Sequence, residues 1–319
     1  MRAWVLALIV VGSVACGESS EKKSGVASES PATSPAPGAG SIPGAPGAPS
    51  GGSNGGDSTT PPAPPPPPKV VVTNETLAVG DKNRDFVLAV PRDIVPAKKY
   101  PIVVVMHGDG GDGVSMRAGM PMDSVTGEDA IVAYPSGTAR SWRLYQPPAD
   151  NPDLAFLTAL VASLVARFDA DAARVFATGF SSGAFMANQL ACRAPALLRG
   201  IASHGGGAPD EPEDPSASTW PSGFVRCANQ TTGVAALIVH GEADEVVPIG
   251  SATHEAKYWS AINECASTKQ PAQPSLPSPC VAYDGCPSTR PVALCSIPGL
   301  GHAPWTEALT TTWHFFRAL

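Results

Sequence analysis

Short, largely apolar runs rich in β-branched residues recur along the second part of the chain. They span residues 70–72, 86–90, 102–106, 131–134, 175–178, 236–239 and 292–297. The middle runs are continuous rather than alternating, as expected of strands that are buried on both faces of a parallel sheet. Apolar residues at helical spacing lie between the runs, at residues 154–168, 182–193 and 254–263. Strand and helix therefore alternate, which predicts a single, mostly parallel, doubly wound α/β domain over residues 70–319.

The residues before position 70 have a different composition. Residues 16–69 are rich in Gly, Ser, Ala and Pro, end in a run of prolines and contain very few aliphatic side chains. Such a segment cannot bury enough apolar surface to offset the entropy that it would lose on ordering. We therefore expect residues 16–69 to be a disordered tether.

Residues 1–15 have the organisation of a secretory signal peptide. Arg2 precedes an apolar run at residues 3–11, and small residues then lead to Cys16. Cleavage is expected before Cys16, which also resembles the lipidated cysteine of bacterial lipoproteins. Simple export and a short buried helix are the alternatives. The sequence thus predicts an exported bacterial protein that is extracellular or held at the cell surface or outer membrane by a lipid on Cys16.

Charge and hydropathy exclude two classes of protein. The chain has 21 Lys and Arg against 28 Asp and Glu, and its basic residues are not clustered as nucleic-acid binding requires. No apolar stretch reaches the roughly 20 residues of a membrane-spanning helix. The membrane is therefore expected as a partner only through the N-terminal lipid. The chain has no Cys-x-x-Cys pair or His-rich cluster, so we expect no metal. We also expect no cofactor and a monomer.

The cysteines predict disulfides. Seven are present, and six remain once Cys16 is set aside with the signal region. In an oxidising compartment six cysteines can form three bridges, with fifteen possible connectivities. Cys280 and Cys295 flank the apolar runs 281–283 and 292–294, so a hairpin would place them opposite each other. That bridge is the one that the residues themselves favour.

One segment has the features of a catalytic nucleophile. Residues 179–183 read Gly-Phe-Ser-Ser-Gly and fit the Gly-x-Ser-x-Gly pattern, but residues 51–55 in the tether fit it too. Only the first segment follows a buried run and opens a helix, which is the setting of a sharp strand-to-helix turn that exposes a serine. Its two glycines would avoid collisions in such a turn. We predict Ser181 as the nucleophile, with an ordinary turn as the alternative.

A serine nucleophile needs a base, which in folds of this kind comes last in the chain order Ser, Asp, His. His302 lies in a Gly-flanked loop just after the run at 292–297, where an imidazole can reach the turn. His254 and His314 fall in predicted helices. His302 is therefore the predicted general base.

The acid of the triad should also follow a strand. Asp244 comes shortly after the run at 236–239, within a segment that begins at His240. Glu242 and Glu245 are the alternatives, since they lie in the same loop. Asp244 is the predicted acid, and His240 is expected to be a structural residue at the end of the strand.

During acyl transfer negative charge develops on a carbonyl oxygen, so backbone amides should be positioned to donate hydrogen bonds to it. The amide of Ser182 follows the nucleophile at the positive end of its helix. The Gly-rich loop at residues 107–111 suggests the amide of Asp109 as the second donor, although a generic turn is the alternative. The Asp109 carboxylate must then face away from the oxyanion.

Several of these segments resemble a known family. Residues 106–108, 178–183, 190–192, 240–248 and 301–305 look like the secreted polyhydroxybutyrate depolymerase and feruloyl esterase group of α/β-hydrolases, the carbohydrate esterase family 1 type. The resemblance implies the α/β-hydrolase fold, a triad of Ser181, Asp244 and His302, and hydrolysis without a metal. It also implies two further disulfides, Cys265 with Cys286 and Cys192 with Cys227.

The sequence therefore predicts a secreted serine esterase. Its substrates would be carboxylic esters, including polymeric ones: a polyhydroxyalkanoate-type polyester, or feruloyl and acetyl esters of plant polysaccharide. Trp142, Trp220 and Trp305 are candidates for lining an acyl or polymer groove, although each could instead be a packing residue. A secreted serine peptidase of the same fold and a non-catalytic binding lipoprotein are the alternatives.

Overall fold

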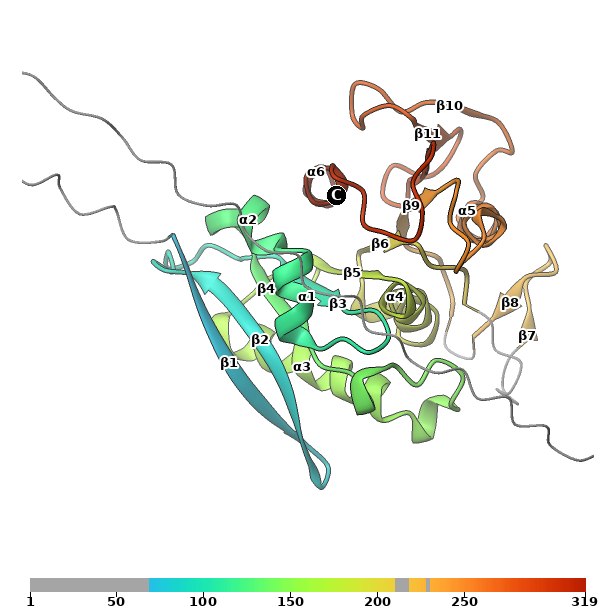
Figure 1. Ribbon diagram of the computed structural model, residues 1–319. Coiled ribbons are helices and arrows are strands. Elements are labelled where there is room, and N and C mark those ends of the chain that lie inside the picture. Colours follow the sequence, from blue (N-terminus) through green and yellow to red (C-terminus); the bar gives the residue numbers. More distant parts are fainter. Residues whose placement is uncertain (1–68, 210–217, 228–229) are drawn as a thin grey trace, which may run out of the picture. The chain divides into compact units, whose positions relative to one another are not determined.

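A computed structural model describes residues 69–209, 218–227 and 230–319 (Figure 1). The expected signal peptide, the lipidation at Cys16 and the tether up to residue 68 lie outside the described residues. One sheet of ten strands dominates the described part, in the order β1-β2-β4-β3-β5-β6-β9-β12-β11-β10. Its strands are β1 (Val70–Val79), β2 (Lys82–Pro91), β3 (Ile102–Met106), β4 (Ile131–Pro135), β5 (Val175–Phe180), β6 (Gly200–His204), β9 (Ala235–Gly241), β10 (Lys269–Pro271), β11 (Cys280–Tyr283) and β12 (Val292–Ile297).

The centre of this sheet is parallel and its two edges are antiparallel. Strands β4, β3, β5, β6, β9 and β12 run in the same direction. The β1–β2 hairpin closes one edge and β11 with β10 the other, as Figure 1 shows. The predicted α/β-hydrolase fold with a mostly parallel sheet is confirmed. In such sheets a binding site forms beyond the carboxyl ends of the parallel strands.

Helices cover both faces of the sheet. They are α1 (Gly113–Gly119), α2 (Met122–Thr126), α3 (Pro152–Phe168), α4 (Ser182–Arg193), α5 (Ile249–Ile262) and α6 (Ala308–Arg317), with short 3-10 turns η1 (Gly127–Asp129), η2 (Thr138–Arg140), η3 (Pro148–Asp150) and η4 (Pro195–Leu197). Apolar residues of α3, α4 and α5 share one core cluster, and those of α1, α2 and α6 share the other. None of the described helices is both long and apolar enough to cross a membrane.

Some elements differ from the sequence prediction. Strand β6 was not predicted, because Gly-Ile-Ala-Ser-His is not an apolar run, yet all five residues are buried between β5 and β9. The expected strand at 70–72 extends to Val79, since an edge hairpin tolerates the polar residues that follow. Helix α5 begins at Ile249 rather than at residue 254, directly after Pro248. A proline fits there because the first amides of a helix have no partner within it.

The start of helix α3 also differs. It begins at Pro152 rather than at residue 154, and Asn151 caps it by accepting hydrogen bonds from the amides of Asp153 and Leu154. The Asp153 carboxylate is buried in an ion pair with Arg84, and it accepts hydrogen bonds from the Thr138 and Arg143 amides. This residue thereby fixes the loop that follows β4.

The structure contains three disulfides, with the pairings that were expected: Cys280–Cys295, Cys265–Cys286 and Cys192–Cys227. The first joins residues that face each other in the ladder between β11 and β12. The last ties the end of α4 to the segment after a small hairpin, β7 (Ser218–Thr219) with β8 (Val225–Arg226).

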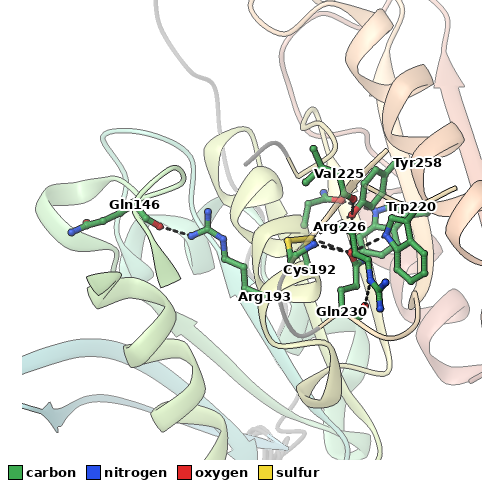
Figure 2. The surroundings of a disulfide bond; sticks show 11 residues. Gln146, Cys192, Arg193, Trp220, Val225, Arg226, Gln230 and Tyr258 are labelled. Carbon is green, nitrogen blue, oxygen red and sulfur yellow. Dashed lines mark hydrogen bonds between the residues drawn. A yellow bond between two sulfur atoms is a disulfide. The ribbon is translucent and has the colours of Figure 1, made fainter. Parts of the chain in front are cut away.

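The buried Gln230 organises the surroundings of the Cys192–Cys227 bridge (Figure 2). Its side-chain oxygen accepts from the Trp220 indole at 3.2 Å and from the Tyr258 hydroxyl at 3.2 Å. The Arg226 guanidinium lies over the Trp220 ring at 4.7 Å. Trp220 is therefore part of this packing rather than the wall of a substrate groove.

Candidate active site

The turn between β5 and α4 is a strained elbow with Ser181 at its tip. Ser181 has φ 55° and ψ −124°, in the left-handed region that non-glycine residues rarely adopt. Its amide donates to the carbonyl of His204 on β6 at 2.9 Å. A Cβ at Gly179 would lie 2.5 Å from the Gly183 carbonyl carbon, and one at Gly183 would lie 2.2 Å from the Met106 oxygen. Both glycines are thus required by close backbone contacts.

Gly183→Ala is expected to destabilise the fold by about 1–3 kcal/mol, because its methyl group would overlap the Met106 carbonyl and force backbone shifts. Chemical denaturation followed by circular dichroism measures the loss. Gly250→Ala is the matched control, since a Cβ there meets no atom within 4 Å. A Gly183→Ala protein as stable as Gly250→Ala would show that the elbow is not tightly packed.

The structure brings Ser181, His302 and Asp244 together beyond the carboxyl ends of β5, β12 and β9. His302 Nε2 lies 2.9 Å from Ser181 Oγ, and His302 Nδ1 lies 2.7 Å from Asp244 Oδ2. The Asp244 side chain is 1% exposed and the His302 side chain 17%. The Phe180 ring packs against the His302 imidazole with centroids 4.8 Å apart. The three residues form a continuous hydrogen-bonded chain.

Asp244 is held as a carboxylate by its surroundings. Burial acts to raise its pKa, but the hydrogen bonds from His302 and from the amides of Val247 and Val246 lower it, and the net effect is a pKa below the ordinary value. A carboxylate on the Nδ1 side keeps the Nδ1 proton in place. His302 Nε2 is then left as the acceptor for the Ser181 hydroxyl.

The alternative partners lie elsewhere. Glu242 and Glu245 are exposed, and His254 is an exposed residue of α5 that contacts Phe224 at 5.4 Å between ring centroids. His314 is an exposed residue of α6. None of the four takes part in the hydrogen-bonded chain at Ser181 within the described residues.

His240 supports the loop that carries Asp244. It is buried at the end of β9, and its Nε2 donates to the Val247 carbonyl at 2.7 Å. The same nitrogen lies 3.5 Å from Asp244 Oδ2. This placement fits the structural role expected for His240.

The two amides considered for the oxyanion are both available. Within the described residues neither the Ser182 nor the Asp109 backbone amide donates a hydrogen bond. Residue Gly108 brings the second loop against the nucleophile, since a Cβ there would lie 3.3 Å from Ser181 Cβ. The Asp109 carboxylate accepts from the Ser141 hydroxyl at 2.6 Å and is thus engaged with the loop that carries Ser141.

The loop at residues 107–111 is supported by hydrogen bonds from the loop that follows β4. The Gly137 amide donates to His107 Nε2 at 2.9 Å, so Nδ1 carries the proton and donates to the Gly108 carbonyl at 2.7 Å. Burial lowers the pKa of His107, which favours this neutral form. Arg140 adds hydrogen bonds to the Gly110 carbonyl and the Asp112 carboxylate, both at 2.8 Å.

Trp142 does not line a groove, contrary to the suggestion from the sequence. It is 4% exposed, and its indole nitrogen donates to the His107 carbonyl at 2.8 Å. Its ring lies 4.8 Å from the His107 ring, so it belongs to the same support. Trp305 is partly exposed and packs against the core cluster that includes α6. A tryptophan in a predicted loop does not by itself indicate a substrate groove, because a loop can itself be buried.

A cavity of about 250 Å³ adjoins the serine. Its walls include the 107–111 loop, Phe180, Pro304, Met116 of α1 and Met120, which directly follows that helix. The methionines were missed because the short helix α1 was not predicted; their spacing of four residues was the available signal. A larger cavity of about 640 Å³ lies between the β1–β2 hairpin and residues 136–140. Neither cavity is lined by Ser181, His302 or Asp244, but the smaller one is lined by Phe180, which precedes Ser181 and packs against His302.

The chain is similar to known esterases in sequence and structure. A family model described as Phospholipase/Carboxylesterase matches residues 155–281. Feruloyl esterase C of Emericella nidulans is 28% identical over 249 residues, which cover 74% of this chain and 84% of the relative. An acetyl xylan esterase from Aspergillus awamori aligns with a TM-score of 0.63 at 17% identity, covering 77% of this chain and 99% of that one. These findings confirm the expected resemblance to the feruloyl esterase group of α/β-hydrolases.

Proposed function

We propose that this α/β-hydrolase, a relative of the feruloyl esterases, hydrolyses carboxylic esters through an acyl-enzyme on Ser181. The observation that carries the proposal is the hydrogen-bonded chain from Ser181 through His302 to Asp244, with contacts of 2.9 and 2.7 Å. A strained serine beside a base that is itself oriented by an acid is the arrangement that nucleophilic catalysis needs.

In the first step Ser181 Oγ attacks the ester carbonyl carbon while His302 Nε2 takes the hydroxyl proton. Asp244 keeps the imidazole in the correct tautomer and stabilises the imidazolium that forms. The carbonyl oxygen becomes an oxyanion, which the free amides of Ser182 and Asp109 are positioned to stabilise. No metal is needed for this charge, because the two amides and the start of helix α4 supply the positive potential.

In the second step the tetrahedral intermediate collapses and the alkoxide leaves with the proton from His302. The acyl group is then attached to Ser181. A water molecule gives its proton to His302 and attacks the acyl carbonyl, and Ser181 recovers its proton as the carboxylic acid departs. The same two amides stabilise both intermediates.

Among esters we propose feruloyl or acetyl groups on plant polysaccharide ahead of a polyester. Feruloyl esterase C of Emericella nidulans, which is 28% identical to this chain over 249 residues, supports this order. The cavity of about 250 Å³ has room for roughly eight water-sized groups at about 30 Å³ each. The methionine and phenylalanine side chains also suit an aromatic ring. A feruloyl group fits these walls better than an acetyl group.

The test uses the purified protein with methyl ferulate, acetylated xylan, polyhydroxybutyrate film and a set of peptide nitroanilides. We expect hydrolysis of the esters, with methyl ferulate fastest, and no cleavage of the peptides. Cleavage of peptides but not of esters would support a serine peptidase of the same fold instead. A protein that hydrolyses nothing and resists a fluorophosphonate probe would be a binding protein.

Filling the cavity should separate large from small acyl groups. Gly119 lines the cavity, and a Cβ there would meet no atom within 4 Å, so the backbone can accept the Cβ of Gly119→Phe. We expect kcat/KM for methyl ferulate to fall about 10-fold or more, with acetyl esters much less affected. Val114→Phe places the same ring on an exposed position of α1 outside the cavity and should change neither. Equal losses for both substrates would place the acyl group elsewhere.

We also propose that the chain is exported, with residues 1–15 removed and residues 16–69 acting as a tether, which Cys16 anchors when lipidated. The three disulfides support export, because such bonds persist in oxidising compartments. Radiolabelled palmitate on the full-length protein, and its loss in Cys16→Ser, distinguishes a lipoprotein from a freely secreted enzyme.

A further inference from the structure

A buried carboxyl group lies behind the nucleophile and has no part in the triad. Glu255 belongs to the second turn of α5, and its side chain is 0% exposed. Its two oxygens bind two different elements. Oε1 accepts from Asn188 Nδ2 of α4 at 2.8 Å, and Oε2 lies 3.0 Å from Ser203 Oγ of β6.

Both partners of Glu255 lead directly to the elbow. Asn188 Nδ2 also donates to the Ala184 carbonyl at 3.0 Å, in the first turn of the helix that follows Ser181. Ser203 precedes His204, whose carbonyl accepts the Ser181 amide at 2.9 Å. Ser203 is also the ladder partner of Gly179 at the start of the elbow. Glu255 thus joins the two elements that hold the nucleophile, the first turn of α4 and the end of β6.

No positively charged side chain among the described residues would balance the negative charge of an ionised Glu255. Among the described residues no cation forms an ion pair with Glu255. Strands β9 and β12, against which α5 packs, contribute the apolar residues Ala236, Ile238, Val292 and Leu294 to the same core. The titratable His240 lies on the same face of β9 as Ile238, and its Nε2 donates to the Val247 carbonyl rather than to Glu255. On β6 the other titratable group, His204, binds Thr312 of α6 and so faces the opposite side of the sheet. On α5 itself His254 and Lys257 are exposed, and the Tyr258 hydroxyl donates to Gln230 Oε1 and the Val225 carbonyl. On α4 the Arg193 guanidinium donates to the Gln146 carbonyl.

A carboxyl in this position is a neutral acid at neutral pH. Burial raises the pKa of Glu255 to about 8, although the hydrogen bonds from Asn188 and Ser203 act to lower it. The Ser203 hydroxyl donates to Oε2 when the carboxyl is ionised, whereas in the neutral acid a proton on Oε2 would be donated to Ser203 Oγ instead, with Oε1 still accepting from the Asn188 amide. Removing that proton would leave an unpaired negative charge in the apolar core beneath the elbow.

We propose that Glu255 is a positioning residue of the ester hydrolase site, which holds the Ser181 elbow only while it is a neutral acid, so that its ionisation sets the alkaline limit of activity. The inference rests on the proposed function. The triad by itself predicts a different profile: a base such as His302 must be neutral, so its activity rises with pH and then levels off. A fall at alkaline pH therefore needs another group.

The same group makes stability depend on pH. Its folded-state pKa is raised above the unfolded value, so its contribution to stability is fully present below the unfolded pKa and is lost as pH rises through about 8. The unfolding temperature of the unmodified protein should therefore decline as pH rises toward about 8 and level off above it, whereas activity falls above about pH 8.

The test compares the kcat profile of the wild type with that of Glu255→Gln, using p-nitrophenyl acetate from pH 6 to pH 10. The amide cannot ionise, and it keeps an oxygen for Asn188 and an NH₂ group for Ser203. We expect the variant to match wild-type kcat at pH 7, whereas the wild type alone falls about tenfold per pH unit above about pH 8, with KM unchanged in both. Glu264→Gln, an exposed glutamate just beyond the same helix, is the matched control and should behave as the wild type.

If kcat of the wild type and of Glu255→Gln depended on pH in the same way above about pH 8, the proposal would be overturned. Infrared spectroscopy adds a readout that needs neither the variant nor turnover: the wild type should show a carboxylic-acid band at pH 6 that disappears as pH rises through about 8. A wild type without that band at pH 6 would equally overturn it. Absence of ester hydrolysis at every pH would instead refute the proposed function, while the infrared band would still report the state of Glu255.

Discussion

Ser181→Ala should abolish nearly all hydrolysis of p-nitrophenyl esters, with a loss in kcat of about 10³-fold or more. The Ser181 hydroxyl oxygen, which lies 2.9 Å from His302 Nε2, is the atom that would attack the substrate. The fold should be retained, because the smaller side chain leaves the Ser181 amide free to donate to the His204 carbonyl. Steady-state kinetics and circular dichroism together measure the two effects.

An exposed serine provides the control for this substitution. Ser267→Ala lies outside the site and should leave kcat and KM unchanged. A Ser181→Ala protein that keeps more than about a tenth of wild-type activity would place the nucleophile at another residue.

Asp244→Asn should lower kcat by about 10⁴-fold without disturbing the loop. The asparagine keeps an oxygen for the Val246 and Val247 amides, but its NH₂ group would face His302 Nδ1 and donate to it. The imidazole would then carry its proton on Nε2 and could no longer accept the proton of Ser181. The comparison uses kcat at pH 7, where the wild-type aspartate is ionised because its pKa lies below the ordinary value.

The neighbouring carboxylate is the matched control for the acid. Glu245 is exposed, lies next to Asp244 in the chain and was the alternative acid from the sequence. Glu245→Gln should keep activity within about threefold of the wild type, as expected for a surface substitution. A large loss in Glu245→Gln together with a small one in Asp244→Asn would reverse the assignment.

The parallel centre of the sheet was predictable because strands covered on both faces leave an unmistakable apolar run. Strands β3, β4 and β5 appear in the sequence at nearly their observed bounds. Strand β6 did not, since Gly200 and Ser203 interrupt its apolar character while its neighbours bury it completely. Burial of a short strand is decided by the sheet around it, which no local pattern reports.

In the candidate site too, residues marked by a local sequence pattern could be predicted, whereas residues placed by long-range contacts could not. Ser181, Asp244 and His302 could be chosen because each follows a recognisable strand, and loops at the carboxyl ends of parallel strands meet. The supports of the site depend on contacts between distant segments, such as Trp142 with His107 and Glu255 with Ser203. A tryptophan or a glutamate carries no sequence signal for such a contact, so Trp142 was misplaced in a groove and Glu255 was not singled out.

The central claim is that Ser181 is the nucleophile of an ester hydrolase. The most direct measurement treats the purified protein with a fluorophosphonate, digests it and locates the added phosphonyl group by mass spectrometry. We predict a single adduct on Ser181, formed at the rate at which p-nitrophenyl acetate hydrolysis is lost. Complete loss of ester hydrolysis with the adduct on a different residue, or continued hydrolysis with Ser181 fully modified, would contradict the claim.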